Sequence, residues 1–222
     1  LRHVYKYLPL SLIHKQRLRQ IYLASGFSAR SDTPTITSDD GLGRDHSLEA
    51  LPLMAASAKQ FDPSDPWTLV VELHIPTPDQ DSGSVRMSAI IRLLREMGFR
   101  ITFISDSEEC LPQYREILEK QGIDVLQGFQ AARRHLEATG GKYHFVLLSR
   151  PEVAFQYLFL AKAHALYATI IYDTVDLHWV RLEREMQVLG DRALLDAIVH
   201  YRCMELLCSE SADLVVAITN EG

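Results

Sequence analysis

The chain has 222 residues, of which 47% are hydrophobic and 23% charged, and its formal net charge is −6 at pH 7. This length and composition suit one large α/β domain with an appendage, and they exclude a wholly disordered chain. The acidic balance argues against nucleic acid as a partner, and three cysteines without a CxxC pair indicate a reducing, cytoplasmic compartment and no structural zinc.

The N-terminal residues 1–27 are predicted to form a basic amphipathic helical extension. Residues 1–31 contain six basic side chains and no acidic one, so the remaining chain carries a net charge of −12. Such a helix can lie on an anionic membrane surface, which would place the protein at the inner face of the membrane. The alternative is a helix that packs on the body or joins it to an upstream domain. Residues 28–66 are predicted to be a linker with a short helix over 48–60.

From Trp67 onward, short apolar runs alternate with amphipathic segments. We predict six strands from the runs TLVVELHI, FRITFIS, IDVL, YHFVLLS, ATIIYD and LVVAIT. Helices are predicted between them, over residues 84–97, 111–121, 128–138, 151–165, 178–189 and 192–210. This alternation predicts that residues 67–222 form a Rossmann-like, doubly wound α/β domain with a mainly parallel, six-stranded sheet.

In an open parallel sheet, ligands bind beyond the carboxyl ends of the strands, where the strand order reverses. The loop IPTPDQDSGSVR at residues 75–86 follows the first such end. Gly83 allows a ligand to approach the backbone, and the amides of Gly83 and Ser84 face out of a helix N-terminus that attracts anions such as phosphate. The alternative is an ordinary helix start, with Asp81 or Ser82 as its cap.

A second candidate segment is YDTVDLHW at residues 172–179. It places Asp173, Asp176 and His178 within six residues after a strand, and these groups can bind hydroxyls or transfer protons. The alternative is that one of the two aspartates caps the following helix and that His178 is a partly buried core histidine.

Two further charged residues attract notice. Arg150 closes another strand, and its guanidinium could hold a phosphate or sugar oxygen through two parallel hydrogen bonds. The alternative is a surface ion pair with Glu152 or Asp106. Glu72 is unusual within a strand that otherwise has a buried pattern, and it is expected to pair with His74 or with a basic group.

Four segments between about Leu69 and the end of the chain point to a known family. They are IPTPDQDSGSVRM with a helix ending in LLREMG, VLLSRPEVA, IIYDTVDLHWVRLERE and SADLVVAITNEG. Together they resemble the N-terminal half of the GT-B glycosyltransferases, in particular the retaining family 4 group that acts in bacterial surface polysaccharide assembly. The chain departs from the double-glycine loop common in that family, because it has Ser82 before Gly83.

The resemblance implies a hexosyltransferase built from two Rossmann-like halves, in which the N-terminal half binds the acceptor and the C-terminal half binds a nucleotide-sugar donor. This chain resembles the first half only, so we expect a piece of a longer protein that lacks its C-terminal donor domain. By the same resemblance, Gly83 and Ser84 would approach the donor phosphates, while Asp176 and His178 would line the reacting sugar.

We therefore expect the acceptor-binding half of a glycosyltransferase, which moves a sugar from a nucleotide-sugar donor to a glycan or lipid-linked acceptor, with neither a metal nor a cofactor. The predicted catalytic residues are Asp176 and His178, and the predicted binding residues are Asp81, Ser82, Gly83, Ser84, Arg86, Arg150, Asp173 and Thr219. This prediction requires that the Gly83, Arg150, Asp176 and His178 positions share one rim of the sheet. The alternative is a noncatalytic nucleotide- or cobalamin-binding module of a larger protein.

Overall fold

The computed structural model of the protein describes residues 5–6, 56–109 and 111–217. Its strands are β1 (Tyr5–Lys6), β2 (Trp67–Glu72), β3 (Arg100–Ser105), β4 (Asp124–Gln127), β5 (Tyr143–Ser149), β6 (Thr169–Asp173) and β7 (Leu214–Ala217). Its α-helices are α3 (Ser82–Glu96), α4 (Pro112–Lys120), α5 (Phe129–Thr139), α6 (Pro151–His164), α7 (His178–Leu189) and α8 (Leu195–Ser211), with 3-10 turns η1 (Gly140–Lys142) and η2 (Arg192–Leu194).

The strands form one parallel sheet in the order β1-β7-β6-β5-β2-β3-β4. The chain order reverses between β2 and β5, which is the arrangement of doubly wound, dinucleotide-binding folds. The predicted Rossmann-like fold and its six strands are confirmed, and the two-residue β1 adds a further strand beside β7. Apart from β1, the helical extension predicted over residues 1–27 lies outside the described residues. Within the predicted linker, residues 56–60 are helical.

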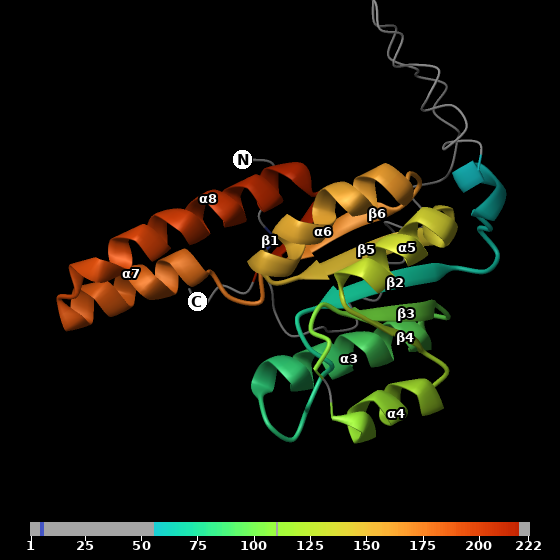
Figure 1. The fold of residues 1–222 in the computed structure, drawn as a ribbon, viewed down its shortest axis with the longest axis horizontal. Helices are drawn as coiled ribbons and strands as arrows, with labels where there is room; N and C mark the ends of the chain where they lie inside the picture. The colour runs from blue at the N-terminus through green and yellow to red at the C-terminus, as the bar shows by residue number, and fades with distance from the viewer. Residues whose placement is uncertain (1–4, 7–55, 110, 218–222) are drawn as a thin grey trace, which may run out of the picture.

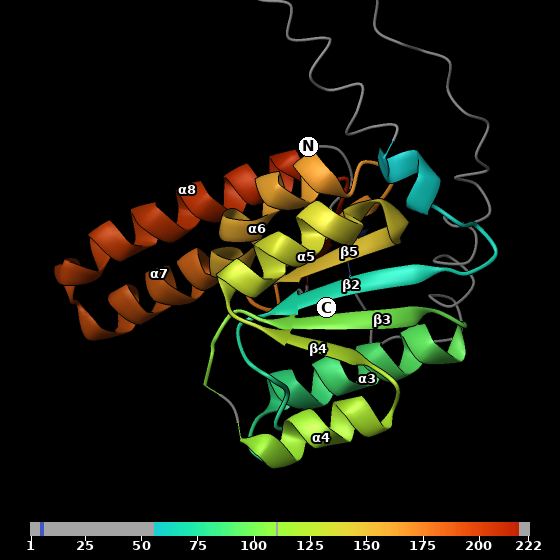
Figure 2. The ribbon, with the colours of Figure 1, turned by 45° about the vertical axis from the view of Figure 1, so that its right-hand side comes forward.

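Helices cover both faces of the sheet (Figures 1 and 2). Along β2, Leu69 and Val71 pack into the core beneath α5, α6 and α8, whereas Val70 packs into the core beneath α3 and α4. Successive side chains of a strand point to opposite faces, so a strand covered on both faces needs an unbroken apolar run. The run TLVVE in β2 meets this need until Glu72, at the carboxyl end of the strand.

Helix α3 starts at the loop that the sequence singled out. Asp81 is its N-cap, and the Asp81 carboxylate accepts a hydrogen bond from the Ser84 amide at 2.8 Å. The expectation that Asp81 or Ser82 caps this helix is therefore met by Asp81. Met87, Ile91 and Leu94 form the buried stripe that holds the helix on the sheet.

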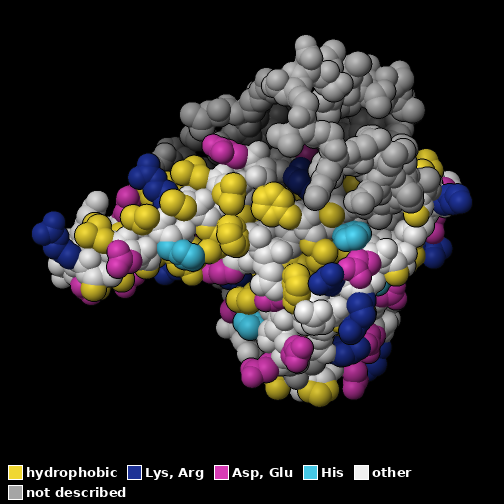
Figure 3. All heavy atoms as spheres, turned by 45° about the horizontal axis from the view of Figure 1, so that its top comes forward, with side chains coloured by type: hydrophobic (Ala, Val, Ile, Leu, Met, Phe, Trp, Pro, Cys, Tyr) yellow, Lys and Arg dark blue, Asp and Glu magenta, His cyan; other side chains and the backbone are white. Residues whose placement is uncertain are grey.

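Helices α7 and α8 form a hairpin that projects from the body of the molecule (Figures 1 and 2). All residues of α7 are described and none of their side chains is buried, while Val188 and Leu189 near the tip are 83% and 66% exposed. Apolar side chains gather along this hairpin and on the adjoining part of the body (Figure 3). None of the helices in the described part of the chain is long and apolar enough to cross a membrane.

Candidate functional site

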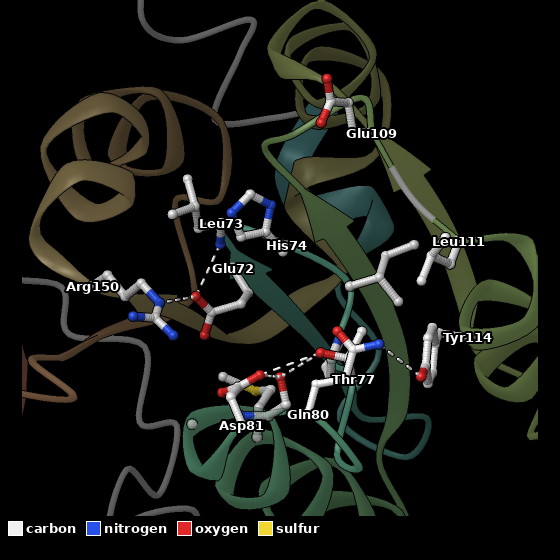
Figure 4. Close-up of a pocket in the computed structure, with 15 residues that line it drawn as sticks. Glu72, Leu73, His74, Thr77, Gln80, Asp81, Glu109, Leu111, Tyr114 and Arg150 are labelled. Atoms are coloured by element: carbon white, nitrogen blue, oxygen red, sulfur yellow. Dashed lines mark hydrogen bonds and ion pairs between the residues drawn. The ribbon is translucent and has the colours of Figure 1, made fainter.

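A cavity of about 670 Å³ opens at the carboxyl end of β2, beside the point where the strand order reverses. Its walls come from residues 72–77, the start of α3, the segment leading into α4, and Arg150 at the end of β5 (Figure 4). This is the place where doubly wound folds bind their ligands, and the volume falls in the range of small-molecule sites.

Glu72 forms the floor of the charged side of this cavity. Its side chain is buried, and its carboxylate accepts hydrogen bonds from the Leu73 amide at 2.9 Å, from Arg150 Nε at 2.7 Å and from Ser149 Oγ at 2.5 Å. A buried carboxylate is tolerated when it is paired and hydrogen-bonded in this way. The expectation that Glu72 pairs with a basic group is confirmed, and the partner is Arg150.

Arg150 has a backbone conformation that is nearly exclusive to glycine, with φ 76° and ψ 151°. Its amide donates a hydrogen bond to the Asp173 carbonyl at 2.9 Å, and its carbonyl accepts one from the Ala154 amide at 2.9 Å. The pairing of Arg150 with Glu152 or Asp106, which the sequence left open, does not occur, because the side chain turns across the end of β2 to Glu72.

Gly83 marks the place where Arg150 meets the start of α3. A Cβ atom on Gly83 would lie 3.1 Å from Arg150 Nη2 and 3.1 Å from Asp81 Oδ1. The absence of a side chain at Gly83 therefore lets a cation and an anion approach the backbone at the start of α3 from the same side. Among the described residues, Arg150 donates from Nε to Glu72, and no hydrogen bond from Nη1 or Nη2 is found there.

The Asp81 carboxylate is held at this place by three hydroxyl and amide donors. Besides the Ser84 amide, Ser84 Oγ donates to it at 2.5 Å and Thr77 Oγ1 at 3.2 Å. The hydrogen bonds from Ser84 lower the pKa of Asp81, with smaller contributions from Thr77 and from the positive charge of Arg150. Asp81 is therefore an ionised group at the cavity wall.

The wall of the cavity opposite Arg150 has the uncharged polar side chains of Gln80 and Tyr114 at its centre. Tyr114, near the start of α4, donates its hydroxyl hydrogen to the Asp79 carboxylate, whose two oxygens both lie 2.7 Å away, and Gln80 Nε2 donates to the Tyr114 oxygen at 3.2 Å. These bonds tie the loop after β2 to α4 and so fix the shape of the cavity (Figure 4). Thr77 and Gln80 belong to the loop that the sequence singled out but were not named as binding residues, and Tyr114 lies outside every segment that was singled out.

Arg86 and Asp173, both predicted as binding residues, pair with each other. The guanidinium of Arg86 makes two parallel hydrogen bonds to the Asp173 carboxylate, one of them between Nη2 and Oδ1 at 2.9 Å, and Asp173 is buried. This pair fastens α3 to the end of β6. Neither residue belongs to the cavity lining.

Asp176 and His178, the predicted catalytic residues, follow β6 at the same edge of the sheet but lie outside the described cavity lining. Asp176 is exposed and accepts a hydrogen bond from Arg181 Nε at 3.0 Å. His178 begins α7, and the structure places it at the base of the hairpin. Its amide donates to Glu205 Oε1 at 2.8 Å, and its ring stacks on Tyr201 with centroids 5.0 Å apart.

The ring of His178 also interacts with Glu205, since its Nδ1 lies 3.2 Å from Glu205 Oε1. This hydrogen bond raises the pKa of His178 against the effect of burial, and Glu152 and Asp176 raise it further. The interaction fastens the start of α7 to α8, and His178 is not part of the cavity lining. The structure therefore does not bring the two predicted catalytic residues to the cavity.

Four predicted binding residues line the cavity, and they are Asp81, Gly83, Ser84 and Arg150. Ser82 is exposed on the first turn of α3 and does not line it, and Thr219 lies outside the described residues. Among the described residues, no group of three or more His, Cys, Asp or Glu side chains is placed to hold a metal ion.

The fold and the cavity define the class of this protein as a Rossmann-like, doubly wound α/β protein with a candidate ligand site at its switch point. No protein-family model matches the chain, and no curated protein matches it. Function is therefore argued from the residues of the cavity, since a fold of this kind serves many activities.

Proposed function

We propose that this chain is the acceptor-binding half of a glycosyltransferase, which moves a sugar from a nucleotide-sugar donor to a glycan or lipid-linked acceptor. The observation that carries the proposal is the cavity at the carboxyl end of β2, where Arg150 and Asp81 lie beside Gly83 in the lining. The four segments that resemble the N-terminal half of the GT-B glycosyltransferases add support, because two of them contribute residues to this cavity.

The charges of the cavity fit an acceptor site better than a donor site. Transfer from a nucleotide sugar requires positive groups that stabilise the leaving diphosphate, and it requires polar groups that orient the acceptor hydroxyl. Arg150 is the single Lys or Arg residue of the described lining, and Glu72 already pairs with it. A second, donor-binding half would have to supply most of the charge that a diphosphate needs.

The proposal gives His178 a structural part, because its contacts lie with α8 at the base of the hairpin. Hydroxyl orientation is assigned instead to the residues around Gly83. The purified 222-residue chain is accordingly expected to transfer no sugar on its own. Turnover of a nucleotide sugar by this chain alone would contradict the assignment to the acceptor half.

A noncatalytic nucleotide-binding module is the second candidate, and the strand order favours it. The reversal between β2 and β5 is the order of dinucleotide-binding folds. One observation argues against this candidate. The Ser84 amide at the start of α3 already donates its hydrogen bond to the Asp81 carboxylate, whereas in a nucleotide site a phosphate oxygen would accept that hydrogen bond.

A glycan-array experiment tests the proposal with one variant and a matched control. The labelled chain is expected to bind a subset of glycans, and Gly83→Leu is expected to abolish that binding because the new side chain fills the space beside Arg150. Ser82→Ala alters the neighbouring, exposed residue of the same helical turn and should leave binding unchanged. Binding of nucleotides without any glycan would favour the second candidate.

A further inference from the structure

Resting on the proposed function, we infer that the Gly83 end of the cavity selects a neutral, hydroxylated sugar ring of the acceptor and rejects phosphate. In this arrangement Arg150 determines specificity, and Glu72 is its positioning residue. The inference replaces the expectation that the amides of Gly83 and Ser84 receive the donor phosphates.

The first step concerns the direction of the Arg150 side chain. Glu72 takes the Nε hydrogen of Arg150, and the Glu72 carboxylate is itself fixed by the Leu73 amide and by Ser149 Oγ. This ion pair holds the guanidinium beside the start of α3, with Nη2 3.1 Å from the position that a Cβ atom on Gly83 would take. A donor that is held before the ligand arrives loses little conformational entropy on binding.

The second step concerns the backbone of Arg150. Its φ of 76° is a conformation that glycine adopts freely and that strains any other residue. Strain of this kind gathers at ligand-binding positions, where the surrounding structure enforces it. The arginine side chain therefore serves a purpose that the turn itself does not require, and its remaining donors face the cavity.

The third step is the balance of charge around Gly83. Arg150 contributes one positive charge, while Glu72 and Asp81 contribute two negative charges, and the hydrogen bonds at Asp81 lower its pKa and keep it ionised. A phosphate would thus enter a region whose net charge is already negative. A neutral ring meets no such repulsion.

The fourth step is the match between this place and adjacent hydroxyl groups. Arg150 Nη2 and Asp81 Oδ1 each lie 3.1 Å from the position that a Cβ atom on Gly83 would take, so both groups border the same side of Gly83. A ligand hydroxyl that lies beside both groups can accept from the arginine and donate to the aspartate. Thr77 Oγ1 and Ser84 Oγ lie at the same wall, within hydrogen-bond reach of the Asp81 carboxylate. A hydroxylated ring can satisfy such a mixed set of donors and acceptors, whereas a phosphate dianion can only accept.

The test measures ligand selectivity by NMR titration of the full chain. The probes are a panel of neutral methyl hexosides, their matched uronic acids, and inorganic phosphate. At least one neutral hexoside is expected to bind, and its uronic acid and inorganic phosphate are expected to bind at least several-fold more weakly. Phosphate that binds as tightly as every hexoside would overturn the inference.

Asp81→Asn is the informative variant, because asparagine is also a good helix N-cap and the fold should keep its α3 start. Removal of one unit charge a few ångströms from the ligand should strengthen phosphate binding roughly tenfold. Glu185→Gln removes the same charge from an exposed position on α7, outside the lining, and serves as the matched control, with no change in selectivity expected. Unchanged selectivity in Asp81→Asn would also overturn the inference.

Glu72→Gln tests the positioning role, since glutamine keeps the shape of the side chain and loses the ion pair with Arg150. Hexoside affinity should fall and the ratio of phosphate to hexoside binding should rise, a change that loss of stability alone would not produce.

Failure of this inference is distinguishable from failure of the proposed function. If glycans bind on the array and phosphate displaces them, only the selectivity is wrong, whereas the absence of any glycan or hexoside binding contradicts both.

Discussion

Gly128 and Arg150 occupy equivalent turns at the carboxyl ends of two strands, β4 and β5. The two residues have nearly identical backbone angles, with φ 78° and ψ 151° at Gly128 and φ 76° and ψ 151° at Arg150. Each donates its amide hydrogen to the end of the neighbouring strand at 2.9 Å, Gly128 to the Ser105 carbonyl and Arg150 to the Asp173 carbonyl. Each residue is then followed by a helix.

The two turns share a backbone conformation but differ in residue type and in their position relative to the cavity. The turn after β4 has glycine, which adopts a positive φ without strain, and it lies outside the cavity lining. The turn after β5 has arginine at a cost of about 1–3 kcal/mol of backbone strain, and that arginine lines the cavity. The comparison therefore identifies Arg150 as a residue whose side chain, and not its backbone, accounts for its presence.

The largest effect should come from removal of the Arg150 charge. Arg150→Leu leaves the Glu72 carboxylate, which is 6% exposed, without the positive charge that it pairs with. Loss of one member of a buried pair is expected to cost about 3 kcal/mol, and thermal unfolding should begin some 6–12 °C lower. Adding Glu72→Gln to Arg150→Leu should recover most of the loss. Equal stability of the single and double variants would show that an uncompensated charge on Glu72 is not the cause of the loss.

A smaller effect should distinguish the two backbones directly. Arg150→Gly and Arg150→Ala both remove the ion pair, yet the glycine variant should be more stable by about 1–3 kcal/mol because it relieves the strained φ. Gly128→Ala should lower stability by a similar amount. Urea unfolding of the three variants measures these differences. If Arg150→Ala is as stable as Arg150→Gly, the positive φ at residue 150 does not strain the backbone.

A third turn extends the comparison, because Val175 after β6 also has a positive φ, of 58°. Val175→Gly is expected to raise the free energy of unfolding by about 1 kcal/mol, since a left-handed backbone disfavours residues with a Cβ atom. Val175→Ala keeps the unfavourable φ and is the control, with little gain expected. A similar gain from both variants would assign the effect to the valine side chain and not to the backbone.

The smallest effect concerns the base of the hairpin, where the same turn leads into α7. The pKa of His178 is raised by its hydrogen bond to Glu205, so its charged form stabilises the fold. This stabilisation is fully present below the ordinary pKa of 6.5 and is lost as the pH rises through the raised pKa. Between about pH 6 and about pH 9 the wild-type urea midpoint should therefore fall more than that of His178→Gln. His200→Gln, an exposed histidine on α8, should keep the wild-type pH dependence.

Most of the fold could be predicted from the sequence, because each signal it depends on is local. The apolar run at residues 68–71 predicts a strand buried on both faces, and the spacing of Met87, Ile91 and Leu94 predicts the stripe of α3. The predicted helix over 151–165 corresponds to α6 at Pro151–His164. Parallel topology follows from the alternation of these elements and needs no knowledge of distant contacts.

The candidate site was predicted only in part, because its central contact is not local. Glu72 and Arg150 are 78 residues apart, and they meet because β2 and β5 are neighbours in the sheet. The strand order is not written in any short motif. The proline after Arg150 restricts the preceding residue to an extended ψ, but it does not predict a positive φ. Glu205, which holds His178, lies 27 residues further along the chain, and periodicity alone does not show which way α7 turns.

The α7–α8 hairpin joins the body at one end, through Met204 and Cys208 of α8 in the core and the hydrogen bond that Tyr201 donates to Glu152 of α6. Because none of the side chains in residues 178–189 is buried, this helix should open as a separate cooperative unit, with amide exchange well ahead of the sheet. The hairpin leaves the body after β6, the strand next to β5, and returns to it through α8. Force applied to the tip of the hairpin would therefore reach the sheet at the end of β6, one strand from Arg150.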